Sequence, residues 1–184
     1  MSDLVHKTRI FGFYGGILKK HISYSELKIW SECPYKHKLI YLDKIKKFIG
    51  NEFTAFGKAL HAVCENVAKG DLTGEDCDEY FDLEFLKELK MLEGQVEFRP
   101  KLVSQMREQA KTINPQIFPA LQEKFPNYEV FSVEEGLYEP INEFTEDSIK
   151  LKGFIDLVIK TEDGKYHVID WKTCSWGWDR EKRT

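Results

Sequence analysis

The sequence predicts a mixed α/β (α+β) domain, with N-terminal helices packed on a central mixed sheet that contains an antiparallel meander. Two observations predict this class. Helix-compatible apolar spacing fills most of residues 23–124, whereas residues 128–173 have the composition of three successive strands. Helices followed by a run of strands are typical of α+β domains. Because the 184 residues contain no repeat and no linker, we expect a single domain over 1–184.

Four segments carry helical signals. Residues 23–45, SYSELKIWSECPYKHKLIYLDKI, begin with serine caps and are interrupted by Pro34, which predicts two short helices that meet at Cys33 and Pro34. The strongest helix is predicted from a cap at Asn51 to a stop at Gly70. Its apolar core stripe consists of Phe56, Leu60, Val63 and Val67. Residues 78–93 and about 100–124 also have helical spacing, softened by Pro115 and Pro119.

The strand region contains charges where burial makes charge expensive. Residues 128–141, YEVFSVEEGLYEPI, predict one strand, and residues 151–173, LKGFIDLVIKTEDGKYHVIDWKT, predict two more joined by a turn. The last two strands hold Asp156, Asp170 and Lys172. Unpaired buried charges cost several kcal/mol or more, so a compensating cation or a solvated face is required.

The loop length of this hairpin decides whether the aspartates share a face. A two-residue Asp163-Gly164 loop would place Asp156 opposite Trp171, with the aspartates on opposite faces. A three-residue loop over 162–164, with Gly164 left-handed, would place Asp156 opposite Asp170. Both loops suit the sequence. Because like charges repel across strands, the second register makes sense only with a cation between the carboxylates, and we predict this odd-numbered loop.

Composition excludes few functions. Hydrophobic content of 42% and charged content of 32% are typical of a soluble globular protein, and a net charge of −4 excludes only a wholly basic surface. No long apolar run or signal peptide is present, so no membrane span is expected. The four cysteines form no C-x-x-C pair, and with no secretory signal we expect a cytoplasmic, intracellular protein.

A polar stripe lies beside the apolar stripe of the strongest helix. Gly57, His61 and Glu65 recur every four residues. A histidine in such a place is often structural, but Gly57 removes a side chain one turn earlier and would let another backbone or a substrate approach. A neutral imidazole beside carboxylates binds divalent ions and extends the choice of metal from Mg²⁺ to Mn²⁺.

These motifs resemble the PD-(D/E)xK nucleases, and among them the RecB-type exonuclease branch related to CRISPR adaptation and phage recombination nucleases. Four elements carry the resemblance, from about residue 23 to 173: the Ser and Cys-Pro segment SYSELKIWSECPYKHKLIYLDKI, FGKALHAVCE, GFIDLVI and VIDWKT. The resemblance implies a restriction-endonuclease-like core with catalytic Asp156, Asp170 and Lys172. It also implies that Mg²⁺ or Mn²⁺ is held by His61, Asp156, Asp170 and the backbone carbonyl of Trp171.

The remaining roles follow from the same resemblance. Lys172 would orient or activate the attacking water. Glu134 and Glu65 are further candidate ligands, and Glu135 beside Glu134 leaves that assignment open. The implied activity is a metal-dependent nuclease that hydrolyses DNA phosphodiester bonds, an exonuclease in DNA repair or recombination. The alternative is a catalytically silent nuclease-like module that binds nucleic acid or a helicase partner, and an unrelated α+β binding protein is a third reading.

Two features depart from the branch. Its members usually continue with a helix bearing Gln-x-x-x-Tyr, whereas this sequence stops at WDREKRT, so we expect a domain that lacks this helix or is truncated before it. Some relatives bind an iron–sulfur cluster through a cysteine at the position of Cys33 and three later cysteines. Those later cysteines are absent from this sequence, so we expect no cluster and interpret Cys33 as a packed thiol.

The expected macromolecular partner is DNA, as single strands or duplex ends, with a helicase or recombination protein as a further partner and no membrane. Residues 36–47, KHKLIYLDKIKK, follow Tyr35 and suggest a phosphate track with interleaved aromatic rings. The candidate nucleic-acid contacts are Tyr35, Lys36, Lys38 and Lys44. A solvated helix face explains the same pattern, and the basic tail with Arg180, Lys182 and Arg183 is equally open.

Overall fold

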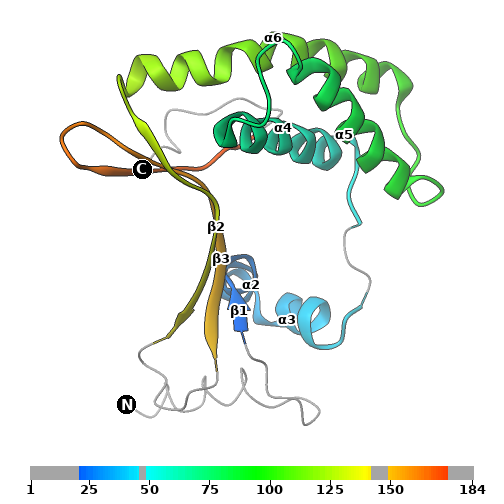
Figure 1. Ribbon diagram of the computed structural model, residues 1–184. Coiled ribbons are helices and arrows are strands. Elements are labelled where there is room, and N and C mark those ends of the chain that lie inside the picture. The colour runs from blue at the N-terminus through cyan, green and yellow to red at the C-terminus, as the bar shows by residue number, and fades with distance from the viewer. Residues whose placement is uncertain (1–20, 46–48, 142–148, 174–184) are drawn as a thin grey trace. The chain divides into compact units, whose positions relative to one another are not determined.

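A computed structural model describes residues 21–45, 49–141 and 149–173 (Figure 1). The elements are β1 (His21–Ser23), α2 (Tyr24–Glu32), α3 (Pro34–His37), the π-helical turn η1 (Lys38–Leu42), α4 (Glu52–Lys69), α5 (Cys77–Leu92), α6 (Pro100–Lys124), β2 (Glu129–Pro140), β3 (Lys150–Lys160) and β4 (Tyr166–Ile169). The predicted order of helices followed by three strands is confirmed. Within the described residues, no helix is both long enough and apolar enough to cross a membrane.

The strands form a mixed sheet around β3. Strand β1 pairs with β3 in parallel, from His21 opposite Lys150 to Ser23 opposite Lys152, and β4 pairs with β3 antiparallel. Strand β2 is the neighbour of β3 on the other side. The predicted mixed α/β class is therefore confirmed, although no sequence signal indicated the short parallel strand β1.

The described residues group into two compact units. The first lies within 1–48 and 136–154, and the second lies within 49–135 and 155–184. Both boundaries on the strand side fall inside β2 and β3, so each unit contains part of both strands. The expectation of a single domain over 1–184 stays a prediction.

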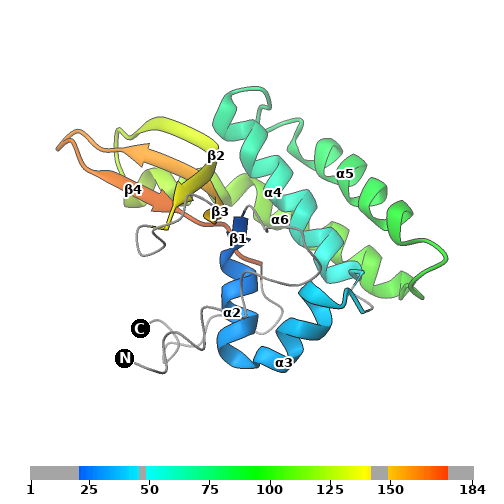
Figure 2. The same cartoon turned by 90° about the horizontal axis from the view of Figure 1, so that it is seen from below.

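In the first unit, α2 and α3 meet at Cys33 and Pro34, as predicted (Figure 2). Ser23 caps α2, because its hydroxyl accepts a hydrogen bond from the Glu26 N–H at 3.2 Å. The Cys33 thiol caps α3 by accepting from the Lys36 N–H at 3.4 Å, and the residue is exposed. The expectation of a packed Cys33 thiol is wrong because the cap position holds this side chain at the surface.

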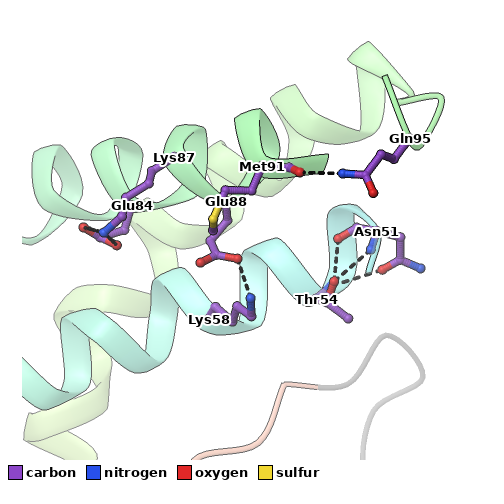
Figure 3. Close-up of polar contacts among 8 residues, drawn as sticks. All are labelled: Asn51, Thr54, Lys58, Glu84, Lys87, Glu88, Met91 and Gln95. Atoms are coloured by element: carbon purple, nitrogen blue, oxygen red, sulfur yellow. Dashed lines mark hydrogen bonds and ion pairs between the residues drawn. The ribbon is translucent and has the colours of Figure 1, made fainter. Parts of the chain in front are cut away.

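In the second unit, α4 begins and ends where the sequence predicts. Asn51 and Thr54 form a reciprocal capping box, with side-chain bonds of 3.1 and 2.8 Å to each other's backbone N–H (Figure 3). Gly70 ends the helix in the left-handed conformation, with φ of +80°. These caps fix the register of the helix that carries Gly57, His61 and Glu65.

Helices α4, α5 and α6 pack together around one apolar cluster (Figure 1). Phe56 of α4 meets Phe81 and Phe85 of α5 edge to face, at ring-centroid distances of 5.5 and 6.1 Å. Helix α6 continues through Pro115 and Pro119 as one element. Its Leu121 packs against Leu157 and Ile159 on the inner face of β3, so the helices hold this part of the sheet.

The β3–β4 hairpin has the three-residue loop. The pairs run from Lys160 opposite Tyr166 to Leu157 opposite Ile169, and the Thr161 N–H donates to the Lys165 carbonyl at 2.9 Å. Gly164 is left-handed, with φ of +78°. The predicted odd-numbered loop is confirmed, and the two-residue alternative is wrong. Continuing this register by one pair places Asp156 opposite Asp170.

Candidate metal centre

Three side chains of the second unit, each from a different element, converge on one point. His61 of α4, Glu134 of β2 and Asp156 of β3 each offer a ligand atom, and these three atoms all lie within 4.8 Å of one another. His61 Nδ1 lies 3.6 Å from Asp156 Oδ2. We predicted that His61 reaches the acidic strand from its helix, and the structure shows that it does.

Asp156 is oriented by the chain that follows β4. Its Oδ2 accepts a hydrogen bond from the Trp171 N–H at 2.7 Å, and its side chain is only 13% exposed. Strand pairing stops one residue before Asp170, and the Trp171 N–H turns to the Asp156 carboxylate. This hydrogen bond fixes Trp171, and residues 171–173 line the pocket beside the site.

Glu134 is held in an unusual backbone conformation. Its φ is +51°, in the left-handed region that costs a residue other than glycine about 1–2 kcal/mol. Burial raises the pKa of its carboxyl, and the negative charges of Glu65 and Asp156 raise it further. Each of these effects penalises an ionised carboxylate, and a bound cation would reverse the penalty. Between the two adjacent glutamates, it is Glu134 and not Glu135 that lies in the group of three donors among the described residues.

A pocket of about 510 Å³ adjoins this group. It is lined by Thr54, Gly57, Lys58, His61, Ala62, Glu65, Glu134, Trp171, Lys172 and Thr173. At Gly57, a Cβ atom would lie 2.9 Å from Thr173 Oγ1. The absent side chain thus lets the Thr173 side chain approach α4, whereas the expected approach of another backbone or a substrate stays a prediction.

The two residues of the D-x-K motif are arranged differently from Asp156. Asp170 and Lys172 form an ion pair with each other, and both side chains are more than half exposed. Lys172 lines the pocket, whereas Asp170 is not in the group of three donors among the described residues. Glu65 also lines the pocket and forms an ion pair with Lys69. The metal and catalytic roles of these residues stay predictions.

The predicted nucleic-acid contacts all lie in the first unit. Tyr35 is 68% exposed and Lys44 is exposed. Lys36 forms an ion pair with Glu32 at 3.8 Å, and Lys38 forms one with Asp43 at 2.8 Å. Exposed ion pairs of this kind contribute little to stability, so the arrangement suits a solvated helix face as well as a phosphate track.

Among the pocket residues that sequence reasoning missed are Lys58 and Thr173. Lys58 precedes His61 by three residues on α4, which is the spacing that places two side chains on one helix face. Extending the polar stripe by this rule would have included it. Thr173 had no comparable signal, because its place depends on the missing side chain of Gly57.

The donors suit a divalent cation. Two ligands held to one ion at about 2.1 Å lie at most about 4.2 Å apart, and the 3.6 Å between His61 Nδ1 and Asp156 Oδ2 is within this limit. The remaining donor lies within 4.8 Å, so adjustment of side chains is sufficient. One imidazole with two carboxylates is a set that binds Mg²⁺ and Mn²⁺.

Comparison with known proteins assigns the chain to a family. The family model described as the PD-(D/E)XK nuclease superfamily matches residues 21–183. No curated protein matches the sequence closely. The matched segment includes every donor of the candidate centre and the D-x-K motif, and the mixed α/β fold agrees with a restriction-endonuclease-like core. The chain belongs to the PD-(D/E)XK nuclease superfamily.

Proposed function

We propose that this protein is a divalent-metal-dependent deoxyribonuclease that works with Mg²⁺ or Mn²⁺. The observation that carries the proposal is the convergence of His61, Glu134 and Asp156 next to a pocket that Lys172 lines. When bound, the metal supplies a nucleophile at neutral pH and cancels charge that develops on the phosphate. The proposed ligands are these three side chains, the Asp170 carboxylate and the Trp171 carbonyl.

Asp170 and Lys172 are assigned linked roles. The observed β3–β4 register, continued by one pair beyond Leu157 and Ile169, would bring Asp170 opposite Asp156, so its carboxylate could exchange its ion pair with Lys172 for the metal. The Lys172 ammonium is then available to orient the attacking water or to bind the phosphate. A compact positive charge at the edge of the pocket suits this task, because its donors rotate freely about the side-chain terminus.

The finer proposal is an exonuclease of the RecB-type branch that acts in DNA repair or recombination inside the cell, with a helicase as a partner. Its support is the order of four motifs along the chain, namely the Ser and Cys-Pro segment, the Gly-x-x-x-His helix, the first acidic strand and the D-x-K strand.

Three variants test the assignment, with Mn²⁺ affinity measured by calorimetry and cleavage measured on end-labelled DNA. Lys172→Ala should keep metal affinity and lose about 10²-fold in cleavage rate, as for one lost partner of a transition state. Asp156→Ala and Asp170→Ala should lose metal binding and cleavage together. Lys165→Ala is the matched control, because Lys165 forms the same kind of exposed ion pair with Asp163 two residues away.

Each result has a defined meaning. Full cleavage by Lys172→Ala would remove the role given to this lysine. Unchanged Mn²⁺ affinity in Asp170→Ala would remove Asp170 from the ligand set and leave His61, Glu134 and Asp156. A folded parent protein that binds DNA but cleaves none with Mg²⁺ or Mn²⁺ would contradict the nuclease proposal and favour the silent module.

A further inference from the structure

Lys58 has no assigned role, yet its position is specific. It lies on α4 three residues before His61 and lines the same pocket as His61 and Lys172. Its side chain is 64% exposed, so the ammonium is accessible to a large ligand. Of the residues that line this pocket, Lys58 and Lys172 carry permanent positive charge, and Glu134 of the metal centre lines the same pocket.

Glu88 of α5 holds this ammonium in place. Lys58 Nζ lies 2.6 Å from Glu88 Oε2, and the glutamate side chain is only 15% exposed (Figure 3). An ammonium has three N–H donors, and the contact with Glu88 uses one of them. The other two remain for a ligand, so the lysine can bind an anion without leaving its carboxylate. Such a pre-oriented cation loses less side-chain freedom on binding.

We propose that Lys58 binds a backbone phosphate of the DNA strand next to the phosphate held at the metal centre. This inference rests on the proposed function and describes where the bound DNA strand passes the same site. The metal would hold the scissile phosphate beside His61 and Lys172, and Lys58 lies one helical turn away along α4. An ammonium bound to phosphate makes a charge-assisted hydrogen bond.

The rest of the pocket agrees with a passing strand. The negative charge of Glu65 is offset by Lys69, so it opposes a phosphate less than a free carboxylate would. A nucleotide is of the size that pockets of a few hundred Å³ bind.

The test measures binding of a fluorescein-labelled single-stranded oligonucleotide by fluorescence anisotropy in EDTA, over a range of salt concentrations. One phosphate contact contributes about 0.7 to the slope of log K against log salt on single strands. Lys58→Ala should therefore lower the slope by about 0.7 and the affinity about five-fold at 0.1 M salt. Lys58→Arg should retain binding.

Lys87→Ala is the matched control. Lys87 lies on α5, is 63% exposed and forms a 3.0 Å ion pair with Glu84, but it does not line the pocket (Figure 3). The Lys87→Ala variant should leave the salt dependence of binding and the affinity for the oligonucleotide unchanged. Equal losses in the two alanine variants would show a general charge effect and overturn the proposal, as would unchanged binding by Lys58→Ala. Because EDTA stops metal-dependent cleavage, this result is independent of whether the parent protein proves to be a nuclease.

Discussion

Replacing Gly57 with alanine tests how closely α4 must approach the D-x-K segment. A Cβ atom at this position would lie 2.9 Å from Thr173 Oγ1, and ordinary van der Waals contacts begin near 3.4 Å. Thr173 must therefore move by about 0.5 Å. Threonine carries two heavy atoms on Cβ, Oγ1 and Cγ2. Two of its three staggered rotamers therefore point a heavy atom toward the new Cβ at position 57. In these two rotamers the shift is transmitted to the backbone beside Lys172, and the third rotamer would relieve the contact.

Stability and activity should respond differently to this change. Alanine in a helix interior is favoured over glycine by about 1 kcal/mol, whereas overpacking costs about 1–3 kcal/mol. The free energy of unfolding should thus fall by about 0–2 kcal/mol, a loss that a folded domain tolerates. A 1 Å displacement of a positioned group costs up to about 10²-fold in rate, so a movement of half that size should lower cleavage about ten-fold.

The measurements are thermal unfolding and the rate of Mn²⁺-dependent cleavage of end-labelled DNA. Thr173→Ala removes the clashing oxygen, so the double variant Gly57→Ala/Thr173→Ala should cleave within about two-fold of Thr173→Ala alone. Two results would refute the reasoning. One is a Gly57→Ala variant as active as the parent, and the other is a double variant that stays as impaired as Gly57→Ala.

Two further changes probe the backbone at the centre and the packing of the helices that support it. Glu134→Asn should raise the free energy of unfolding by about 1 kcal/mol, because asparagine tolerates the left-handed conformation. The same variant should bind Mn²⁺ more weakly in calorimetry. Glu135→Asn is the control and should change neither the stability nor the Mn²⁺ affinity. Hydrogen bonds from Arg107 lower the pKa of the Asp82 carboxyl, so its stabilising effect is present above the usual aspartate pKa of about 3.8 and is lost as pH falls through the lowered value. Asp82→Asn should therefore unfold at lower urea than the parent at pH 7, and a gap of the same size at pH 2 would contradict this assignment.

Local signals explain which parts of the fold were predictable. The caps Ser23, Asn51 and Gly70 act on neighbouring backbone groups, so sequence alone places the ends of α2 and α4. The hairpin loop also has a local cause, since Gly164 supplies the left-handed residue that a three-residue loop requires. Strand β1 lacks such a signal, because a three-residue strand exists only through its partner β3, more than a hundred residues later.

The same distinction separates the parts of the candidate centre. His61 was predictable because helical spacing is local, and Asp156 because the loop sets the register. Glu134 could not be separated from Glu135 by alternation, since its left-handed backbone interrupts the pleat and redirects its side chain.

The charges in the last two strands are tolerated because the sheet pairing ends where they begin. The β3–β4 pairing ends at Leu157 and Ile169. Beyond it, the Trp171 N–H donates a hydrogen bond to the Asp156 carboxylate instead of to a carbonyl of the neighbouring strand. That hydrogen bond offsets part of the desolvation of Asp156 and leaves Asp170 and Lys172 at an exposed edge, where an ion pair suffices. Among the described residues at this end of the sheet, Asp156 and Glu134 are the carboxylates that require further compensation, and both meet at His61. A cation at that point would supply this compensation, and the candidate metal centre lies where the strand pairing ends.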